Sequence, residues 1–184
     1  MITLRSRFIS FSYRVMGAAA LDRGAFEEIE HNPAATLQSA AVVVASSLAA
    51  GIGASAWHLA QPVVLLGVAA IALATWIAWA VLILEIGGRE LPERQTRVNL
   101  GELLRTIGFA ASPGLLQVFA VFPSISIPVF VASWLWMLAA MTVGVRQALD
   151  YQGLGRAFAV CGLAFALVIA AAIILALLFV RVAG

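Results

Sequence analysis

The sequence has few of the residues on which most soluble functions depend. Only 11% of its 184 residues are charged, while 63% are hydrophobic. Lysine is absent, so all 11 basic residues are arginine, and the formal net charge is only +2. A nucleic-acid-binding protein carries a concentrated basic face, so the composition argues against nucleic acid as a partner. Cys161 is the single cysteine, which excludes an internal disulfide and a cysteine-based metal cluster.

Groups suited to catalysis are equally scarce. Histidine occurs only at His31 and His58, and no His-Glu-x-x-His metal motif or glycine-rich phosphate loop is present. We therefore predict a protein that is not an enzyme and that holds no metal or cofactor. Four tryptophans could line a site for a pigment, a quinone or a lipid, but aromatic residues at helical spacing are more typical of packing or of interface anchoring. These are Trp76, Trp79, Trp134 and Trp136.

Long apolar runs are what the sequence has in abundance. A helix needs about 20 apolar residues to cross a bilayer core, and a soluble protein of this length could not bury so much apolar surface. The sequence therefore predicts an all-α polytopic membrane bundle of five transmembrane helices, forming a membrane domain over residues 33–184. The predicted spans are residues 34–59, 62–84, 106–122, 129–145 and 157–180. Gly87-Gly88 is expected to break the helix after the second span, and Asn99 is a candidate cap for the helix that leads into the third.

Residues 1–32 are predicted to lie outside the membrane as short amphipathic helices. Apolar residues recur at helical spacing with arginines between them, which is typical of a helix on a membrane surface. A second helix is predicted after Asp22, a suitable N-cap, with its apolar residues on one face and its glutamates in water. The alternative is a docking surface for a partner. The residues concerned are Leu4, Phe8, Phe11 and Val15, then Phe26 and Ile29, and finally Glu27, Glu28 and Glu30.

The third apolar run is interrupted by Ser112-Pro113-Gly114. Proline has no backbone N–H, so Pro113 leaves the carbonyl of Phe109 without its helical partner. In a membrane such a group must be satisfied by neighbouring protein. We therefore expect this segment to be kinked and buried inside the bundle.

Two stripes of small or aromatic residues recur at every fourth position. Such stripes let helices approach closely. They predict internal helix packing, with contact to a partner protein or to a second copy as the alternative. The candidate contact residues are Ala45, Ala49 and Gly53 in the first span, and Trp136, Ala140 and Gly144 in the fourth.

Arginine placement predicts the topology. With five spans and a cytoplasmic N-terminus, every arginine except Arg181 lies on the cytoplasmic side, as the positive-inside rule requires of short loops. The acids fall on the same side, which predicts salt-bridged packing of the N-terminal helices against the Arg89–Arg105 loop. The C-terminus would lie on the opposite side of the inner membrane. Charges predicted at the cytoplasmic boundary are Glu85, Arg89, Glu102, Arg105, Arg146 and Asp150. They are interpreted as membrane anchors that pair with one another, with a functional cluster as the alternative.

Several segments together resemble the Yip domain family, named for interaction with Ypt/Rab GTPases, and in particular its bacterial branch. They are AALDRGAFEEIEHNPAATLQSA, GGRE, GELLRTIGFAASPGLL, WLWMLAAMTVGVRQALD and GRAFAV. In that family a glycine-aromatic step followed by a proline opens the third span, and Gly108, Phe109 and Pro113 match it here. The resemblance implies five spans and a cytoplasmic N-terminus. The aspartate-leucine-glycine-proline element of eukaryotic members is missing, so their vesicle-trafficking role is not carried over.

Two functional hypotheses follow. The first is a non-enzymatic membrane protein that acts through helix–helix contacts as a scaffold, assembly factor or accessory subunit, or in membrane organisation. Its partners would be the lipid bilayer and another membrane protein or a second copy. The alternative is a small transporter or channel subunit in which the broken third span lines a path.

Overall fold

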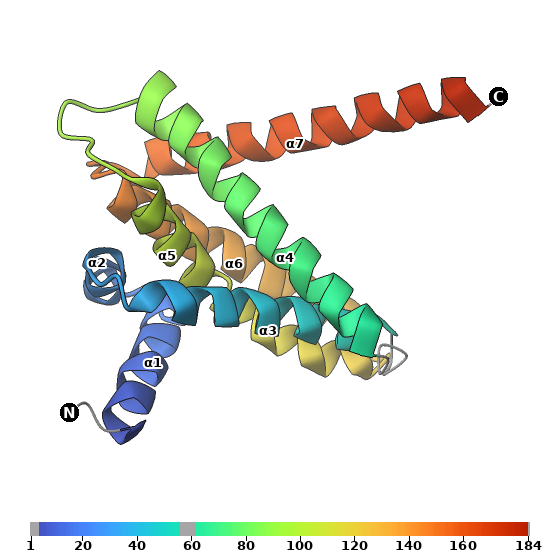
Figure 1. Ribbon diagram of the computed structural model, residues 1–184, viewed down its shortest axis with the longest axis horizontal. Helices are drawn as coiled ribbons and strands as arrows, with labels where there is room; N and C mark the ends of the chain where they lie inside the picture. Colours follow the sequence, from blue (N-terminus) through green and yellow to red (C-terminus); the bar gives the residue numbers. More distant parts are fainter. Residues whose placement is uncertain (1–3, 56–61, 184) are drawn as a thin grey trace.

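The computed structural model describes residues 4–55 and 62–183, and every regular element in these ranges is helical. Two short helices, α1 and α2, lie at one end of a bundle of longer helices (Figure 1). The turn predicted around Gln61 lies outside the described residues. The elements are α1 (Leu4–Ala19), α2 (Arg23–His31), α3 (Ala35–Ser55), α4 (Pro62–Ile83), η1 (Leu84–Glu90), α5 (Leu100–Ala110), η2 (Ser112–Val121), α6 (Ser126–Ala148) and α7 (Leu154–Ala183).

Five helical segments in the described residues are long and apolar enough to cross a membrane, which confirms the predicted polytopic bundle. The chain is thus a multi-pass membrane protein in contact with lipid. The first, fourth and fifth segments overlap the predicted spans, whereas the second runs on to Glu90. The third differs, because its helix begins at Leu100 and so includes the charged residues Glu102 and Arg105.

The third segment is the centre of the bundle. In its apolar stretch 61% of the residues are buried, against 33% in the first segment and 17 to 22% in the other three. It contains two elements, since α5 ends at Ala110 and the chain continues from Ser112 as the 3-10 helix η2. The prediction of a buried segment broken at Ser112-Pro113-Gly114 is therefore confirmed.

Helix capping starts this central segment as the sequence predicts. The side chain of Asn99 accepts the backbone N–H of Glu102 at 3.1 Å, and the carboxylate of Glu102 accepts the N–H of Asn99 at 2.9 Å. This reciprocal arrangement is a capping box. It fixes the start of α5 just outside the buried stretch.

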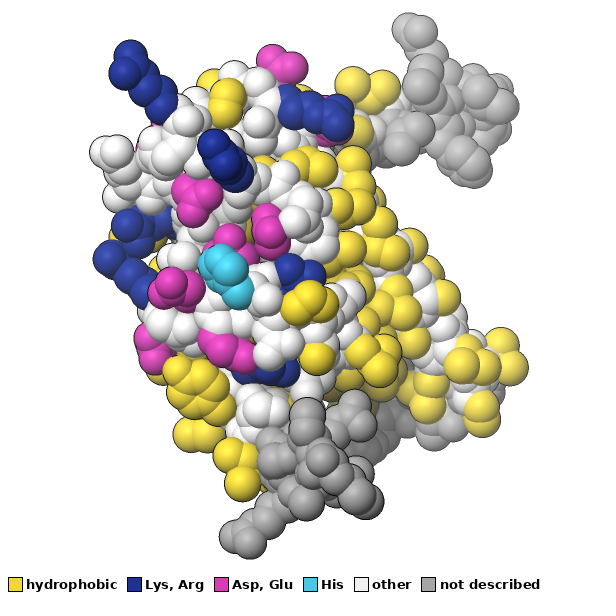
Figure 2. Space-filling view, turned by 60° about the vertical axis from the view of Figure 1, so that its left-hand side comes forward, with side chains coloured by type: hydrophobic (Ala, Val, Ile, Leu, Met, Phe, Trp, Pro, Cys, Tyr) yellow, Lys and Arg dark blue, Asp and Glu magenta, His cyan; other side chains and the backbone are white. Residues whose placement is uncertain are grey.

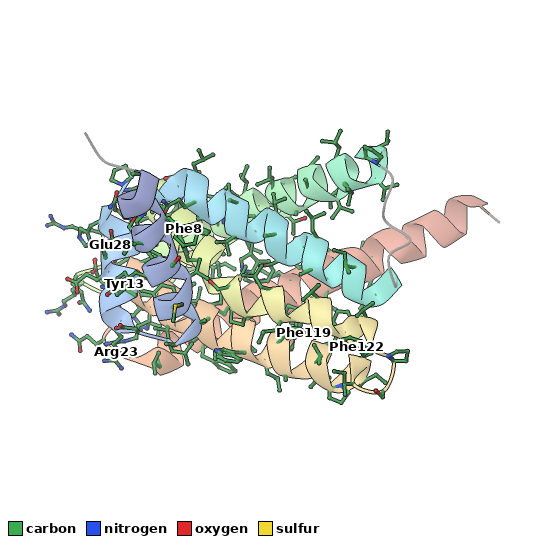
Figure 3. All side chains as sticks on the ribbon, turned by 90° about the horizontal axis from the view of Figure 1, so that it is seen from below. Phe8, Tyr13, Arg23, Glu28, Phe119 and Phe122 are labelled. Atoms are coloured by element: carbon green, nitrogen blue, oxygen red, sulfur yellow. The ribbon has the colours of Figure 1, made fainter. Side chains whose placement is uncertain are left out.

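Helix α1 runs at a steep angle to α3 (Figure 1). Phe8 and Met16 are exposed, whereas Phe11 and Val15 pack against a buried cluster that includes Phe109. The sequence placed Phe8 on the same face as Phe11 and Val15, and the structure separates them. In Figure 3, Phe8 and Tyr13 lie on α1, with Glu28 and Arg23 at the same end of the molecule.

The second span ends differently from the prediction. Gly87-Gly88 were expected to break the helix, but the chain continues as the π-helix η1 through Glu90. Gly87 is needed there for packing, because an added Cβ would lie 2.5 Å from Leu149 Cδ1. The hydroxyl of Tyr151 lies 2.8 Å from the carbonyl oxygen of Gly87 and 2.7 Å from that of Leu91. Tertiary contacts therefore hold the widened turn in place.

Candidate functional site

Charged side chains gather over one end of the molecule, while the adjoining flank is apolar (Figure 2). This end is built by the second half of α1, by α2, by η1, by the loop before α5 with the first half of α5, and by the turn between α6 and α7. We call it the charged end. Two arginines there, Arg14 and Arg105, are buried, with 4% and 8% of their surface exposed. A buried arginine is costly unless its donors are satisfied, so these two side chains define the organisation of this end.

Arg105 joins the third span to the last turn of α2. Its Nε lies 3.0 Å from the carbonyl oxygen of Glu30 and 3.2 Å from that of Ile29, and its Nη2 also donates to the carbonyl of Glu30. The last carbonyls of a helix have no partners within the helix and carry partial negative charge. Arg105 therefore stabilises the C-terminus of α2 and fixes this helix on the bundle.

Arg14 joins the two N-terminal helices to the first span. Its Nε and Nη2 donate to the two carboxylate oxygens of Glu28 at 2.7 and 2.6 Å. Its Nη1 donates to the amide oxygen of Gln38 in α3. This bidentate pair lowers the pKa of Glu28, chiefly through the hydrogen bonds from Arg14. One guanidinium thus holds α1, α2 and α3 together.

Glu30 departs from the sequence prediction. It was expected to face water with Glu27 and Glu28, but only 5% of its surface is exposed. Its Oε2 has no hydrogen-bond partner among the described residues. Burial raises the pKa of Glu30 to about 7. Near neutral pH this carboxyl therefore changes charge at the contact between α2 and the spans.

Among the predicted boundary charges, one pair forms an ion pair, and other residues of the set form hydrogen bonds that involve backbone carbonyls. Glu85 and Arg89 form an exposed ion pair at 2.7 Å. Arg146 donates to the carbonyl of Gln152 at 3.2 Å, while the carbonyl of Asp150 accepts from Gln95 at 3.0 Å. The N-terminal helices were predicted to pack on the Arg89–Arg105 loop through salt bridges, but among the described side chains this contact is made by Arg105 with backbone carbonyls of α2.

The glycines of the predicted stripes make close contacts inside the chain. A Cβ on Gly53 would lie 2.1 Å from the carbonyl oxygen of Gln117, and one on Gly144 would lie 2.9 Å from the ring of Phe26. Ala49 and Ala140 are buried as well, whereas Ala45 is exposed. Trp136 donates from its indole to the carbonyl of Ala19 at 2.7 Å. Most of these positions therefore contact other elements of the same chain.

The break in the third span is satisfied by nearby hydroxyl groups. Ser112 donates to the carbonyl of Phe109, the group that Pro113 leaves without its helical partner. Ser46 of α3 donates to the carbonyl of Ala111 at 2.8 Å. Gly108 lies against Ser39 of α3, and a Cβ added to Gly108 would be 2.6 Å from Ser39 Cβ. Gly108 thus packs closely on α3, while Phe109 and Pro113 are fully buried.

A partly open cavity of about 650 Å³ lies between the spans. Residues of α3, α4, α5, η2, α6 and α7 line it, and no charged side chain is among them. Three of the four tryptophans considered in the sequence lie on its wall, namely Trp76, Trp79 and Trp134. The position of the cavity could not be derived from the sequence, although these tryptophans were considered as the lining of a ligand site, because the lining residues come from segments far apart in the chain.

The described residues contain no group of three or more His, Cys, Asp or Glu side chains that could hold a metal ion. Comparison of the chain with protein-family models, with curated proteins and with solved structures finds no match.

Proposed function

We propose that the chain is a non-enzymatic bacterial inner-membrane protein that acts as a scaffold or accessory subunit through contacts of its fifth span with a transmembrane helix of another subunit. We further propose a cytoplasmic N-terminus, in keeping with the arginines, and a distant relationship to the Yip domain family, in keeping with Gly108, Phe109 and Pro113. The exposure of α7 carries the partner-binding proposal.

Helix α7 leaves the bundle after its first three turns. Ala157, Val160, Cys161 and Ala164 are buried in the core and Phe165 still packs against Trp134, but every side chain from Ala166 to Ala171 is exposed. In Figure 1 the second half of α7 extends away from the other helices. A helix that exposes all its sides while its first half is fixed in a bundle offers an unobstructed surface for close packing of a second transmembrane helix.

Site-specific photocrosslinking in native membranes tests this proposal. A photoreactive phenylalanine at Leu167, which is 47% exposed, is expected to capture one protein in stoichiometric yield. The same probe at Ile77 of α4, which is 45% exposed, serves as the matched control and is expected to capture lipid only. Mass spectrometry identifies the adducts. Lipid adducts alone at Leu167, or the same protein at both positions, would contradict the proposal.

The cavity favours the transporter or channel subunit as a second candidate. Ala111 and Gln117 of the broken third span line it, whereas Ser112 and Gly114 are buried against other elements. A path through the membrane would make position 117 accessible to water. In a Cys161→Ala background, Gln117→Cys would then react with a charged thiol reagent, and Ser112→Cys would not. Lack of reaction at position 117 in every condition would exclude this candidate.

A further inference from the structure

We propose that the cavity between the spans binds a neutral lipid that carries a flat ring with carbonyl oxygens, the chemistry of a prenylated quinone. The site is independent of the contact proposed for the distal half of α7. The proposal depends on three properties of the cavity, which are its size, the aromatic character of its wall, and its hydrogen-bond donors that lack a strong acceptor.

The volume of about 650 Å³ is that of a ligand site. Pockets for small molecules range from about 300 to 1,000 Å³, whereas protein interiors are close-packed with few voids larger than a water molecule. A space of this size with an apolar lining is filled by an apolar molecule in a membrane. Because no charged side chain lines it, the part of the ligand inside is neutral.

Aromatic rings on the wall are held in fixed orientations. The indole of Trp76 donates to the carbonyl of Leu104 at 3.0 Å. Trp134 packs against Phe165 with ring centroids 5.6 Å apart and an interplanar angle of 58°. Rings fixed in this way form preorganised apolar faces against which a flat ring can pack without further loss of side-chain freedom. A bare acyl chain gains no comparable advantage from them.

Polar groups on the wall whose donors lack a strong acceptor can bind a carbonyl oxygen. Gln117 is 8% exposed, and its amide nitrogen donates to the sulfur of Met137 at 4.0 Å. A thioether sulfur is a weak acceptor. The buried indole N–H of Trp79, another lining residue, has no partner among the described residues. A buried donor without a strong acceptor is costly in an apolar medium. A ligand carbonyl would reduce that cost.

Equilibrium binding of radiolabelled ubiquinone-2 to the purified chain in lipid nanodiscs tests the proposal. Ala72→Phe places a ring in the cavity and is expected to weaken binding at least tenfold, as is Ala50→Phe from α3. Ala78→Phe is the matched control, because Ala78 is exposed on the same helix and does not line the cavity. Equal binding by the Ala72→Phe, Ala50→Phe and Ala78→Phe variants would overturn the proposal.

Gln117→Leu separates ring recognition from simple filling of an apolar space. It is expected to weaken ubiquinone-2 binding about tenfold, as the loss of one hydrogen bond implies. Binding of geranylgeraniol, which has a prenyl chain but no carbonyl, is expected to be weak and unchanged by this substitution. Geranylgeraniol binding as tight as that of ubiquinone-2, or retention of phospholipid alone after extraction from native membranes, would refute the quinone-like ligand.

Discussion

The third and fifth spans are both long and apolar enough to cross a membrane, but the rest of the chain covers the third and leaves the fifth exposed. In the third span 61% of the residues of the apolar stretch are buried, and in the fifth only 22%. The fifth has the higher mean hydropathy, 2.1 against 1.3. Hydropathy alone therefore does not identify the central helix. Small residues, a proline break and polar groups with partners identify it, because these features are tolerated only where protein surrounds them.

Glycine substitutions should show the largest difference between the two spans. Gly53→Ala would place a Cβ 2.1 Å from the backbone of Gln117 in the third span, and should destabilise the bundle by about 3 kcal/mol. Gly162→Ala in α7 meets nothing within 4 Å and should leave stability unchanged or slightly higher. Unfolding in mixed micelles, followed by tryptophan fluorescence, measures both. Similar losses for both variants would contradict the central role of the third span.

Arginine substitutions should show the next largest difference. Arg105→Ala removes the side-chain donor to the carbonyl of Glu30 and one of two donors to that of Ile29, which also accepts the N–H of Asn32, and should cost about 2 kcal/mol. Arg156→Ala at the start of α7 removes an exposed guanidinium 3.7 Å from Glu93, and should cost less than about 0.5 kcal/mol. The same unfolding assay applies. An equal cost for the two would show that the clamp on α2 contributes little.

The pH dependence of stability should reveal the carboxyl beside this clamp. Because the pKa of Glu30 is raised to about 7 in the folded protein from its usual 4.5, the unfolded chain binds fewer protons between these values. Stability should therefore fall by about 2 kcal/mol as pH rises from 5 to 8, since one pKa unit corresponds to about 1.4 kcal/mol. His31, whose pKa is raised by the carbonyl of Glu27, acts in the same direction. Glu30→Gln should flatten the profile, and the exposed control Glu27→Gln should not.

Glu28 should act in the opposite direction and at lower pH. Its pKa is lowered by Arg14, so its contribution is present above pH 4.5 and is lost as the solution becomes more acidic. Measurements between pH 5 and 8 therefore exclude Glu28 and report on Glu30 together with His31. An unchanged slope in Glu30→Gln would show that this carboxyl does not control the pH dependence.

The sequence predicted what depends on local chemistry. The apolar runs defined five spans, Asp22 and Asn99 cap the helices that follow them, and Ser112-Pro113-Gly114 marked the break. These predictions succeed because hydropathy, capping and the missing proline N–H act over a few residues.

Features that depend on contacts between distant segments could not be predicted. Arg105 was taken as a boundary charge because the carbonyls that bind it come from α2. Gly87 was taken as a helix break, since neither Tyr151 nor Leu149 can be placed against it from sequence. The cavity and the burial of Glu30 belong to the same class. In each case the chemistry was visible in the sequence but its partner was not.

The smallest expected difference concerns the break itself. Ser46→Ala removes the hydroxyl that donates to the carbonyl of Ala111 at 2.8 Å, and should cost about 0.6 kcal/mol, the average for such bonds between membrane helices. Ser47→Ala is the matched control, since Ser47 lines the cavity on the same helix, and it should cost close to nothing. The 3-10 helix η2 would then be held mainly by close packing at Gly53. If Ser46→Ala instead lowers the stability as much as Gly53→Ala, the hydroxyl of Ser46 is essential to the break. The third span would then be stabilised at the centre of the bundle by hydrogen bonds to its backbone rather than by tight packing.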